Sequence, residues 1–353
     1  MKKICINGKF FSQRVTGTQR YARELLNQFD RLLSTEYNGR IEMELLLPPR
    51  AHRVPHYRNI QTRTVGTSNG TIWEQIELPR HCRGQLLFTP CGGAPILHLR
   101  NVVTIHDAAV IAAPNGYSFA YRNWYKNACR VMARTAEHIF TNSNFSRYEI
   151  AKWYGAPMGK ISVTYLGSDH FSQLESDQST LSRFCLAGKY VLAVSSHNSN
   201  KNFRRVVGAM HHFDKSDLQL AIAGGCDAKI YGNGMKVPDE VCVLGYVRDA
   251  ELKALYENAA CFVFASVYEG FGLPPMEAMS AGCPIVVSRA GALPEIFAKA
   301  AIFCDPYDTE QIAAAIQHAI TDPALTPSQS KSFAQHFTWE KCAHETLEVF
   351  KNL

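Results

Sequence analysis

Short apolar runs and longer segments with helical periodicity alternate along the whole chain. In the amino-terminal half, apolar runs such as 4–7 and 102–105 flank a helical pattern that covers 18–33. The carboxyl-terminal half repeats this alternation, with apolar runs at 190–194 and 261–265. An unbroken apolar run is typical of a strand buried on both faces of a parallel sheet. The pattern therefore predicts the α/β class, with two doubly wound, Rossmann-like sheets.

The chain is long enough for two domains, and its polar pattern indicates where they divide. Its 353 residues exceed what one hydrophobic core usually supports. From residue 168 to 180, Ser, Asp, Gln, Glu and Thr dominate, which is typical of a linker. We therefore predict one domain over 1–168, a linker over 169–181, a second domain over 182–338 and a last helix over 339–353. Two such domains enclose a cleft, and ligands bind beyond the carboxyl ends of the strands.

The segment from Glu269 to Glu277, which reads EGFGLPPME, is the most informative part of the chain. It follows an apolar run and precedes a helical pattern, and Pro275 suits the first turn of a helix. The free N–H groups of a helix start and the positive end of its dipole attract an anion. Gly270 and Gly272 allow a ligand to approach the backbone closely. The two glutamates are then acceptors for hydroxyl groups on either side of a bound phosphate.

This segment resembles the E-x7-E signature of the retaining GT-B glycosyltransferases of family 4, and the match extends over about 28 residues to Ile296. The resemblance implies that Glu269 meets hydroxyls of the donor sugar and that Glu277 binds the ribose. It also implies that the amides of Phe271, Gly272 and Leu273 meet the sugar and the diphosphate, and that the last helix crosses back onto the first domain. The alternative is an ordinary strand–loop–helix unit with two solvated glutamates.

A second polar loop follows the run 190–194 and ends with Lys201 before a helical pattern. The family resemblance implies that this lysine binds the donor diphosphate. The family usually has an arginine five residues earlier, but Ser196 stands at that position here. We therefore expect the charge of the diphosphate to be met by Lys201 and backbone amides, with Arg204 or Arg205 as further candidates. The alternative is a solvated loop lysine.

His106 and Asp107 follow the apolar run 102–105. In the resembled family a histidine at this place contacts the donor sugar across the cleft. We expect His106 to donate a hydrogen bond to the sugar or to the leaving oxygen, and its unperturbed pKa permits either charge state near neutrality. A structural His–Asp pair is the alternative.

Two further stretches agree with the resemblance and are weaker signals by themselves. Gly17 lies between the first strand and the first long helix, where backbone N–H groups can meet a phosphate. Gly245, Tyr246 and Val247 match the stretch that receives the nucleotide base in the family.

Cysteines, hydropathy and carboxylate spacing restrict the remaining possibilities. The eleven cysteines lie singly in the chain, with no C-x-x-C pair, which is typical of reduced core residues in a cytoplasmic protein. No run of 18 apolar residues is available for a membrane-spanning helix. Neither a D-x-D motif nor a carboxylate cluster at metal spacing occurs, so we expect no cofactor and a metal-independent reaction.

Charge is spread unevenly between the two halves. Residues 1–167 hold 22 Lys and Arg and 10 Asp and Glu, a net charge of +12, whereas 168–353 hold 15 and 21, a net charge of −6. A basic stripe recurs every four residues on one predicted helix: Arg122, Lys126, Arg130 and Arg134. Such a face can lie on anionic lipid at the inner side of the plasma membrane, or it is a solvated basic face.

The resemblance implies transfer of a hexosyl group from a GDP- or UDP-hexose to a hydroxyl of a glycan or lipid-linked acceptor, with retention at the anomeric carbon. Assembly of a bacterial surface polysaccharide (O-antigen, capsule or exopolysaccharide) is the expected context, and mannose is the suggested sugar. A GT-B sugar-nucleotide epimerase is the first alternative. A basic nucleic-acid-binding protein is the second, but it leaves the carboxylate loop unexplained, so we expect no nucleic-acid partner. An NAD dehydrogenase is disfavoured because no G-x-G-x-x-G follows the first strand of either half.

Overall fold

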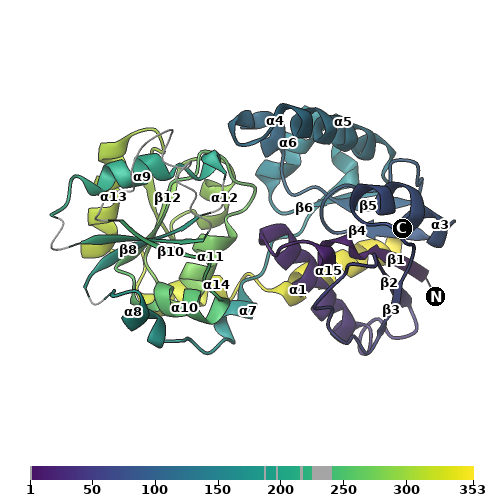
Figure 1. Cartoon of the computed structure of the whole chain (residues 1–353), viewed down its shortest axis with the longest axis horizontal. Coiled ribbons are helices and arrows are strands. Elements are labelled where there is room, and N and C mark those ends of the chain that lie inside the picture. The colour runs from purple at the N-terminus through teal and green to yellow at the C-terminus, as the bar shows by residue number, and fades with distance from the viewer. Residues whose placement is uncertain (1, 187, 196–197, 215–217, 225–240) are drawn as a thin grey trace. The chain divides into compact units, whose positions relative to one another are not determined.

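The computed structural model describes all residues except 1, 187, 196–197, 215–217 and 225–240. The chain folds into two compact units (Figure 1). The first unit comprises 1–111, 118–167 and 339–353, and the second comprises 112–117 and 168–338.

The first unit is built on a seven-stranded parallel sheet whose order is β3-β2-β1-β4-β5-β6-β7. The chain adds strands on one side of β1 and then returns to build the other side, so the strand order reverses between β1 and β4. The strands are β1 (Lys2–Asn7), β2 (Ile41–Leu47), β3 (Ile60–Thr64), β4 (Leu86–Thr89), β5 (Asn101–Thr104), β6 (His138–Thr141) and β7 (Ile161–Val163).

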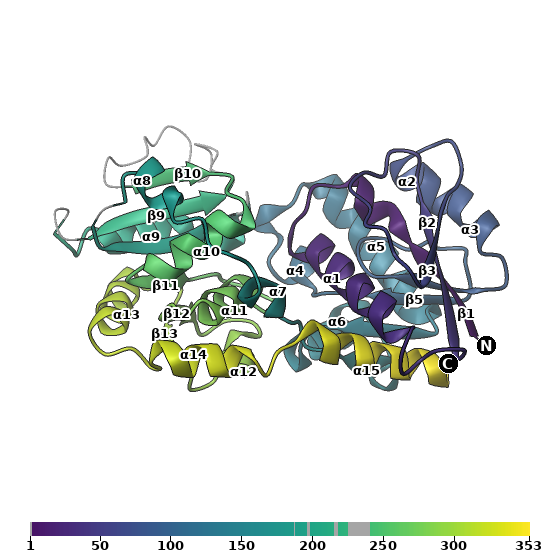
Figure 2. The same cartoon turned by 90° about the horizontal axis from the view of Figure 1, so that it is seen from below.

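Helices cover both faces of this sheet, and successive residues of a strand point to opposite faces. In β6, Phe140 lies 5.8 Å from Phe350 of the last helix, whereas the adjacent Ile139 packs with Met132 and Ile150 on the other face. The helix that carries Phe350 lies beside the first long helix of the unit (Figure 2). The helices are α1 (Gly17–Leu32), α2 (Gly70–Ile72), a π-helical turn (Trp73–Glu77), α3 (Leu78–His81), α4 (Ala109–Ala112), α5 (Phe119–Thr135), α6 (Asn144–Tyr154) and α15 (Trp339–Asn352).

The second unit contains a six-stranded parallel sheet with the order β10-β9-β8-β11-β12-β13, which reverses between β8 and β11. The strands are β8 (Tyr190–Ser195), β9 (Gln219–Gly224), β10 (Val241–Gly245), β11 (Cys261–Phe264), β12 (Ile285–Ser288) and β13 (Ile302–Cys304).

Both faces of this second sheet are also covered. Val263 of β11 belongs to a core formed with Val206 and Ile316, while its neighbour Phe262 lies 5.2 Å from Tyr256 on the opposite face. The helices are α9 (Phe203–Met210), α10 (Asp249–Asn258), α11 (Leu273–Ser280), α12 (Leu293–Phe297), α13 (Thr309–Thr321) and α14 (Pro327–Ala334). The prediction of an α/β fold with two doubly wound sheets is confirmed.

The segment that was expected to be a linker, 169–181, is instead part of the second unit. It contains α7 (Asp169–Ser172) and the start of α8 (Ser179–Arg183). Lys253 of α10 donates hydrogen bonds to the carbonyl oxygens of Ser172 and Leu174, at 3.2 and 2.6 Å. The main chain of this segment is therefore held by α10, and polarity alone did not distinguish it from a linker.

Two general expectations can be compared with the described part of the chain. The ten cysteines in that part are all free, and eight of them are buried. Within the same residues, no helix is both long enough and apolar enough to cross a membrane.

Candidate active site

The point where the second sheet reverses its strand order, between β8 and β11, is the place where open α/β sheets bind ligands. The loop after β8 leads into a 3₁₀ turn, Ser199–Lys201, and the loop after β11 leads to α11. The two loops are joined directly, because the N–H of Val267 donates to the carbonyl oxygen of Asn200 at 2.9 Å.

Lys201 and Glu269, both predicted from the sequence, meet at this point. The Lys201 ammonium lies 2.7 Å from Glu269 Oε1 and 4.7 Å from the centroid of the Phe264 ring. The two side chains are only 20% and 15% exposed. Each charge is therefore largely withdrawn from water and held by its partner, which does not fit the alternative of a solvated loop lysine and a solvated glutamate.

Asn202, which was not predicted from the sequence, stabilises the turn that contains Lys201. Its backbone is left-handed, with φ of +59°, a conformation that asparagine tolerates better than most residues. Its side-chain amide donates to the carbonyl oxygens of Ala265 at 2.9 Å and Pro306 at 2.6 Å. The sequence carried no local signal for this role, because both acceptors lie far along the chain.

The backbone of Glu269 is fixed by the turn at Gly291 and Ala292. The N–H of Ala292 donates to the Glu269 carbonyl oxygen at 2.9 Å. Gly291 has φ of +61°, and a β-carbon there would stand 2.4 Å from that same oxygen. Only glycine fits this position, so the match to the family pattern at Gly291 has a physical reason.

Glycine is also required where α11 begins. Gly272 has φ of +101°, and a β-carbon there would stand 2.6 Å from Leu293 Cδ2. Leu273 is the first residue of α11, and Pro274 and Pro275 follow it without N–H groups of their own. Gly270 and Phe271 are buried in the same loop. The loop thus brings its backbone and the positive end of a helix dipole to the sheet reversal.

Glu277 lies in the middle of α11 and is buried rather than solvated. Its Oε1 is 3.3 Å from Nε2 of His170, a residue of α7 whose side chain is 7% exposed. His170 was missed because it lies in the segment read as a linker. The His170 ring therefore lies beside the Glu277 carboxylate, the group that is expected to bind a ribose.

The other residues predicted in this unit occupy nearby elements. Arg204 and Arg205 line a cavity of about 490 Å³ together with Gly208 and Thr309. Gly245 ends β10 with φ of +67°, and Tyr246 and Val247 follow it at the carboxyl edge of the sheet. Ser196, the departure from the family pattern, lies outside the described residues.

His106 belongs to the first unit, where it follows β5. Its Nε2 lies 3.2 Å from the carbonyl oxygen of Pro90, and its ring stands perpendicular to that of Tyr21 at 4.9 Å. Burial lowers the pKa of His106 to about 4, so the imidazole is neutral near pH 7. A carbonyl only accepts, so Nε2 carries the hydrogen and Nδ1 is left as an acceptor. The expectation that His106 takes either charge state near neutrality is therefore corrected to a neutral ring, and its contact with the donor sugar stays a prediction.

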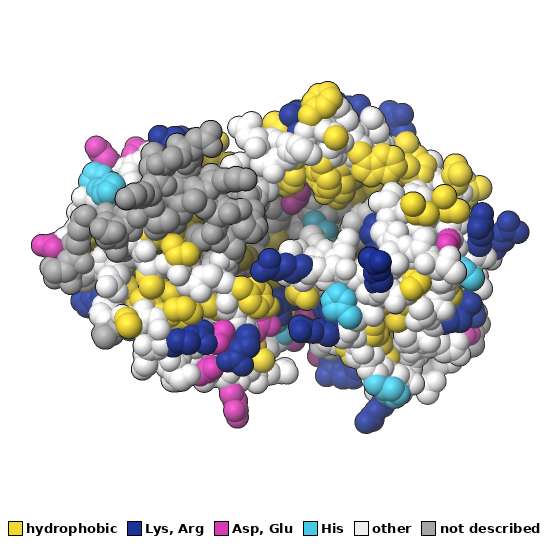
Figure 3. Space-filling view, in the orientation of Figure 1, with side chains coloured by type: hydrophobic (Ala, Val, Ile, Leu, Met, Phe, Trp, Pro, Cys, Tyr) yellow, Lys and Arg dark blue, Asp and Glu magenta, His cyan; other side chains and the backbone are white. Residues whose placement is uncertain are grey.

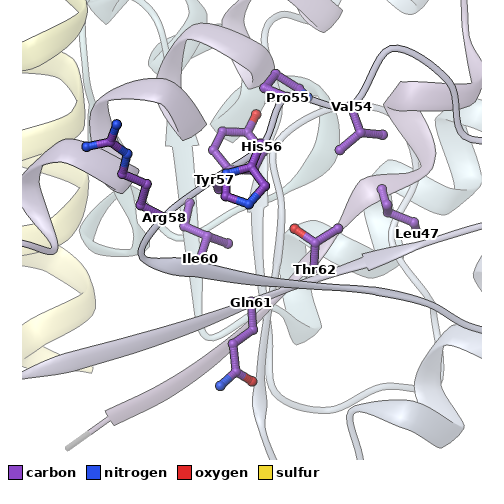
Figure 4. Close-up of a pocket in the computed structure, with 9 residues that line it drawn as sticks. All are labelled: Leu47, Val54, Pro55, His56, Tyr57, Arg58, Ile60, Gln61 and Thr62. Carbon is purple, nitrogen blue, oxygen red and sulfur yellow. The ribbon is translucent and has the colours of Figure 1, made fainter.

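Gly17 is the first residue of α1, and a β-carbon there would meet no atom within 4 Å. Packing does not require glycine at this position, so its open space remains available to a ligand. A further pocket of about 550 Å³ lies at the edge of the sheet of the first unit, where His56 and Tyr57 lie beside β3 (Figure 4). None of the residues predicted as functional lines it.

The described residues contain no group of three or more His, Cys, Asp or Glu side chains arranged to hold a metal ion. Metal independence of the reaction stays a prediction.

Two units, each built on a doubly wound parallel sheet, have the architecture of the GT-B class of glycosyltransferase. The sequence model for glycosyl transferases group 1 matches residues 185–351. The O-antigen chain mannosyltransferase B of Escherichia coli is 30% identical over 269 residues, which cover 72% of this chain and 71% of that protein. The chain belongs to the glycosyl transferases group 1 family, and it is a glycosyltransferase.

Solved structures show the same fold over the whole chain. Sucrose-phosphate synthase from Thermosynechococcus elongatus matches with a TM-score of 0.76 and 18% identity, over 100% of this chain and 99% of that one. Anabaena Alr3699/HepE in complex with UDP and glucose matches with a TM-score of 0.74 and 16% identity, over 100% of both chains.

Proposed function

We propose that this glycosyltransferase moves a mannosyl group from a nucleotide sugar to a hydroxyl of a glycan or lipid-linked acceptor, with retention at the anomeric carbon, during assembly of bacterial O-antigen or a related surface polysaccharide. The observation that carries the proposal is the Lys201–Glu269 pair at the sheet reversal, beside the start of α11. One ligand with a diphosphate and a sugar satisfies both charges, because the phosphate takes the ammonium and sugar hydroxyls take the carboxylate.

In this mechanism the protein contributes preorganised charges and donors. Lys201 stabilises the negative charge that develops on the leaving diphosphate, and Glu269 accepts hydrogen bonds from sugar hydroxyls. The bond between the anomeric carbon and the phosphate oxygen breaks while the acceptor oxygen bonds to the same face of that carbon. The acceptor proton passes to the leaving phosphate oxygen. Glu277 holds the ribose, and His170 keeps its carboxylate oriented.

The names of relatives support the choice of substrates. An E. coli relative is an O-antigen chain mannosyltransferase, which favours a mannosyl donor. The HepE structure contains UDP and glucose, which favours a nucleoside diphosphate as leaving group. A GDP- or UDP-hexose is accordingly the proposed donor.

The basic stripe on α5 supports a further part of the proposal, contact with an anionic membrane from the cytoplasmic side. Arg130 and Arg134 are exposed on this helix. Phe119 and Trp124, on the same helix, are 76% and 52% exposed. Figure 3 shows basic and apolar side chains side by side over this part of the first unit. Arginines that attract lipid headgroups and aromatic rings that enter the interface suit a peripheral site for a lipid-linked acceptor.

Calorimetry with GDP-mannose, UDP-glucose, dTDP-glucose and ADP-glucose tests the donor class. We expect one of the four to bind with a dissociation constant below about 1 mM, the usual upper range for enzyme substrates. NMR of the product's anomeric proton then reports whether the configuration is retained. Absence of binding by all four nucleotide sugars would refute the proposal.

A further inference from the structure

The sheet of the first unit also reverses its strand order, and a buried polar cluster lies at that reversal. Asn7 is the last residue of β1, and Thr89 is the last residue of the neighbouring β4. The side-chain amide of Asn7 donates to Glu74 Oε1 at 2.9 Å and lies 3.5 Å from the Thr89 hydroxyl. The Lys9 ammonium lies 2.5 Å from Glu74 Oε2. The topological rule that located the first site therefore applies to this point of the sheet as well.

A tight turn after β1 brings Asn7 and Lys9 close together. Gly8 begins a 3₁₀ turn directly after β1, and a β-carbon at Gly8 would stand 2.5 Å from the carbonyl oxygen of Leu46. Glycine therefore lets the chain turn tightly against β2. Asn7 Oδ1 accepts the N–H of Lys9 at 3.1 Å and fixes that turn.

Glu74 is placed by an unusual piece of helix. It lies in the π-helical turn, which is anchored by a hydrogen bond of 2.8 Å from the Trp73 indole to the carbonyl oxygen of Val65. Such turns are rare and occur frequently at functional sites. The turn places the Glu74 carboxylate at the end of β1, beside Asn7.

The cluster contains a buried ion pair. The side chains of Glu74 and Lys9 are 2% and 13% exposed. Burial raises the pKa of Glu74, while Lys9 and Asn7 act in the opposite direction. A buried ion pair is costly to desolvate, and apolar side chains of similar volume often stabilise a fold as well or better. The ammonium of Lys9 has three N–H donors, of which Glu74 uses one.

We propose that Lys9, Glu74 and Asn7 form a binding site for a neutral hexose unit of the acceptor. Lys9 donates to one oxygen of a vicinal diol, and Glu74 accepts from the adjacent hydroxyl. This inference rests on the proposed transferase function, and it adds residues of the first unit that recognise the acceptor sugar. The same pairing of a lysine with a glutamate occurs at the reversal of the second sheet, between Lys201 and Glu269.

The test uses the full-length protein and four methyl glycosides as probes: α-mannoside, α-glucoside, α-galactoside and α-N-acetylglucosaminide. Binding is measured by saturation-transfer NMR and titration for the wild type, Lys9→Met and Glu74→Gln. We expect at least one glycoside to bind the wild type. In each variant, the dissociation constant of that glycoside should rise about 10-fold or more, the scale of a hydrogen bond to a charged group. GDP or UDP affinity should remain within about twofold, since that site is built from the second unit.

Glu44→Gln is the matched control, because Glu44 is a buried carboxylate of the same sheet that pairs with Arg63 at 2.6 Å within the strand region. It should leave glycoside binding unchanged. Each single variant leaves one buried charge without its partner and can fail to fold for that reason. The double variant Lys9→Met/Glu74→Gln removes both charges, so glycoside binding can then be measured in a folded protein.

Two results would overturn the inference. One is a wild type that binds none of the four glycosides. The other is a folded double variant with a lower melting temperature and unchanged glycoside affinity, which assigns the pair a structural role. Failure of the proposed function is distinguished separately, because it appears as absence of nucleotide-sugar binding by the wild type.

Discussion

Replacing Gly291 by alanine should displace Glu269 without touching its side chain. Gly291 adopts φ of +61°, and an L-residue in this region costs about 1–2 kcal/mol. The new β-carbon would stand 2.4 Å from the carbonyl oxygen of Glu269 and 2.7 Å from its nitrogen, against an ordinary contact of 3.4–4 Å. Both neighbours are backbone atoms, so no rotamer change relieves the overlap. The backbone of Glu269 must therefore move by on the order of 1 Å, and a displacement of this size can cost about 100-fold in rate.

Urea unfolding of the variant measures the loss of stability from backbone strain, and donor turnover measures the displacement of Glu269. Gly84→Ala is the control, because Gly84 has φ of +69° and a β-carbon there meets no atom within 4 Å. Both variants should lose about 1–2 kcal/mol of stability from backbone strain. Only Gly291→Ala should also lose about 100-fold in kcat/KM. Equal rates for the two variants would refute the role assigned to the turn at Gly291.

Four other predictions concern Glu269, Glu277, His106 and the basic stripe. Glu269→Ala should lower kcat about 100-fold in a protein that still folds by circular dichroism, because its contacts to the sugar act mainly in the transition state; an unchanged kcat contradicts the assignment. Glu277→Ala should weaken GDP or UDP binding by about 1.5–3 kcal/mol in calorimetry, and equal affinity counts against ribose binding. His106 has a folded pKa of about 4, below the unfolded value, so acidification from about pH 7 to about pH 5 should reduce urea stability more in the wild type than in His106→Phe; equal losses contradict the burial argument. Reversing Lys126 and Arg130 to glutamate should weaken sedimentation with anionic vesicles and leave nucleotide affinity unchanged, whereas binding that ignores lipid charge speaks against the membrane site.

The fold followed from the sequence because parallel strands leave a strong local signal. Runs such as 190–194 and 261–265 are apolar at every position, as both faces of their sheet are covered. The segment 169–181 shows where this reasoning fails. Its polar side chains suggested a linker, yet its main chain is held by Lys253, and the side chain of His170 within it contacts Glu277. Composition reports the average exposure of a segment and not the partners of single residues.

The candidate site was predicted where chemistry and backbone coincide in a short segment. Glu269 and the glycines near it were readable because the loop between a strand and a helix demands particular residue types. Asn202 was not readable, since its two acceptors are 63 and 104 residues away along the chain. The pKa of His106 depends on burial, which a sequence does not display.

An ion pair lies at each of the two sheet reversals. Where strand order reverses, the helices that follow the two central strands leave toward opposite faces, so a crevice opens beyond the strand ends. Lys201 with Glu269, and Lys9 with Glu74, place opposite charges at these two points. A ligand that arrives there exchanges one partner for another, because each charge has already lost most of its water. The cost of desolvating the protein groups is thus met during folding rather than during binding, which is the physical meaning of a preorganised polar site.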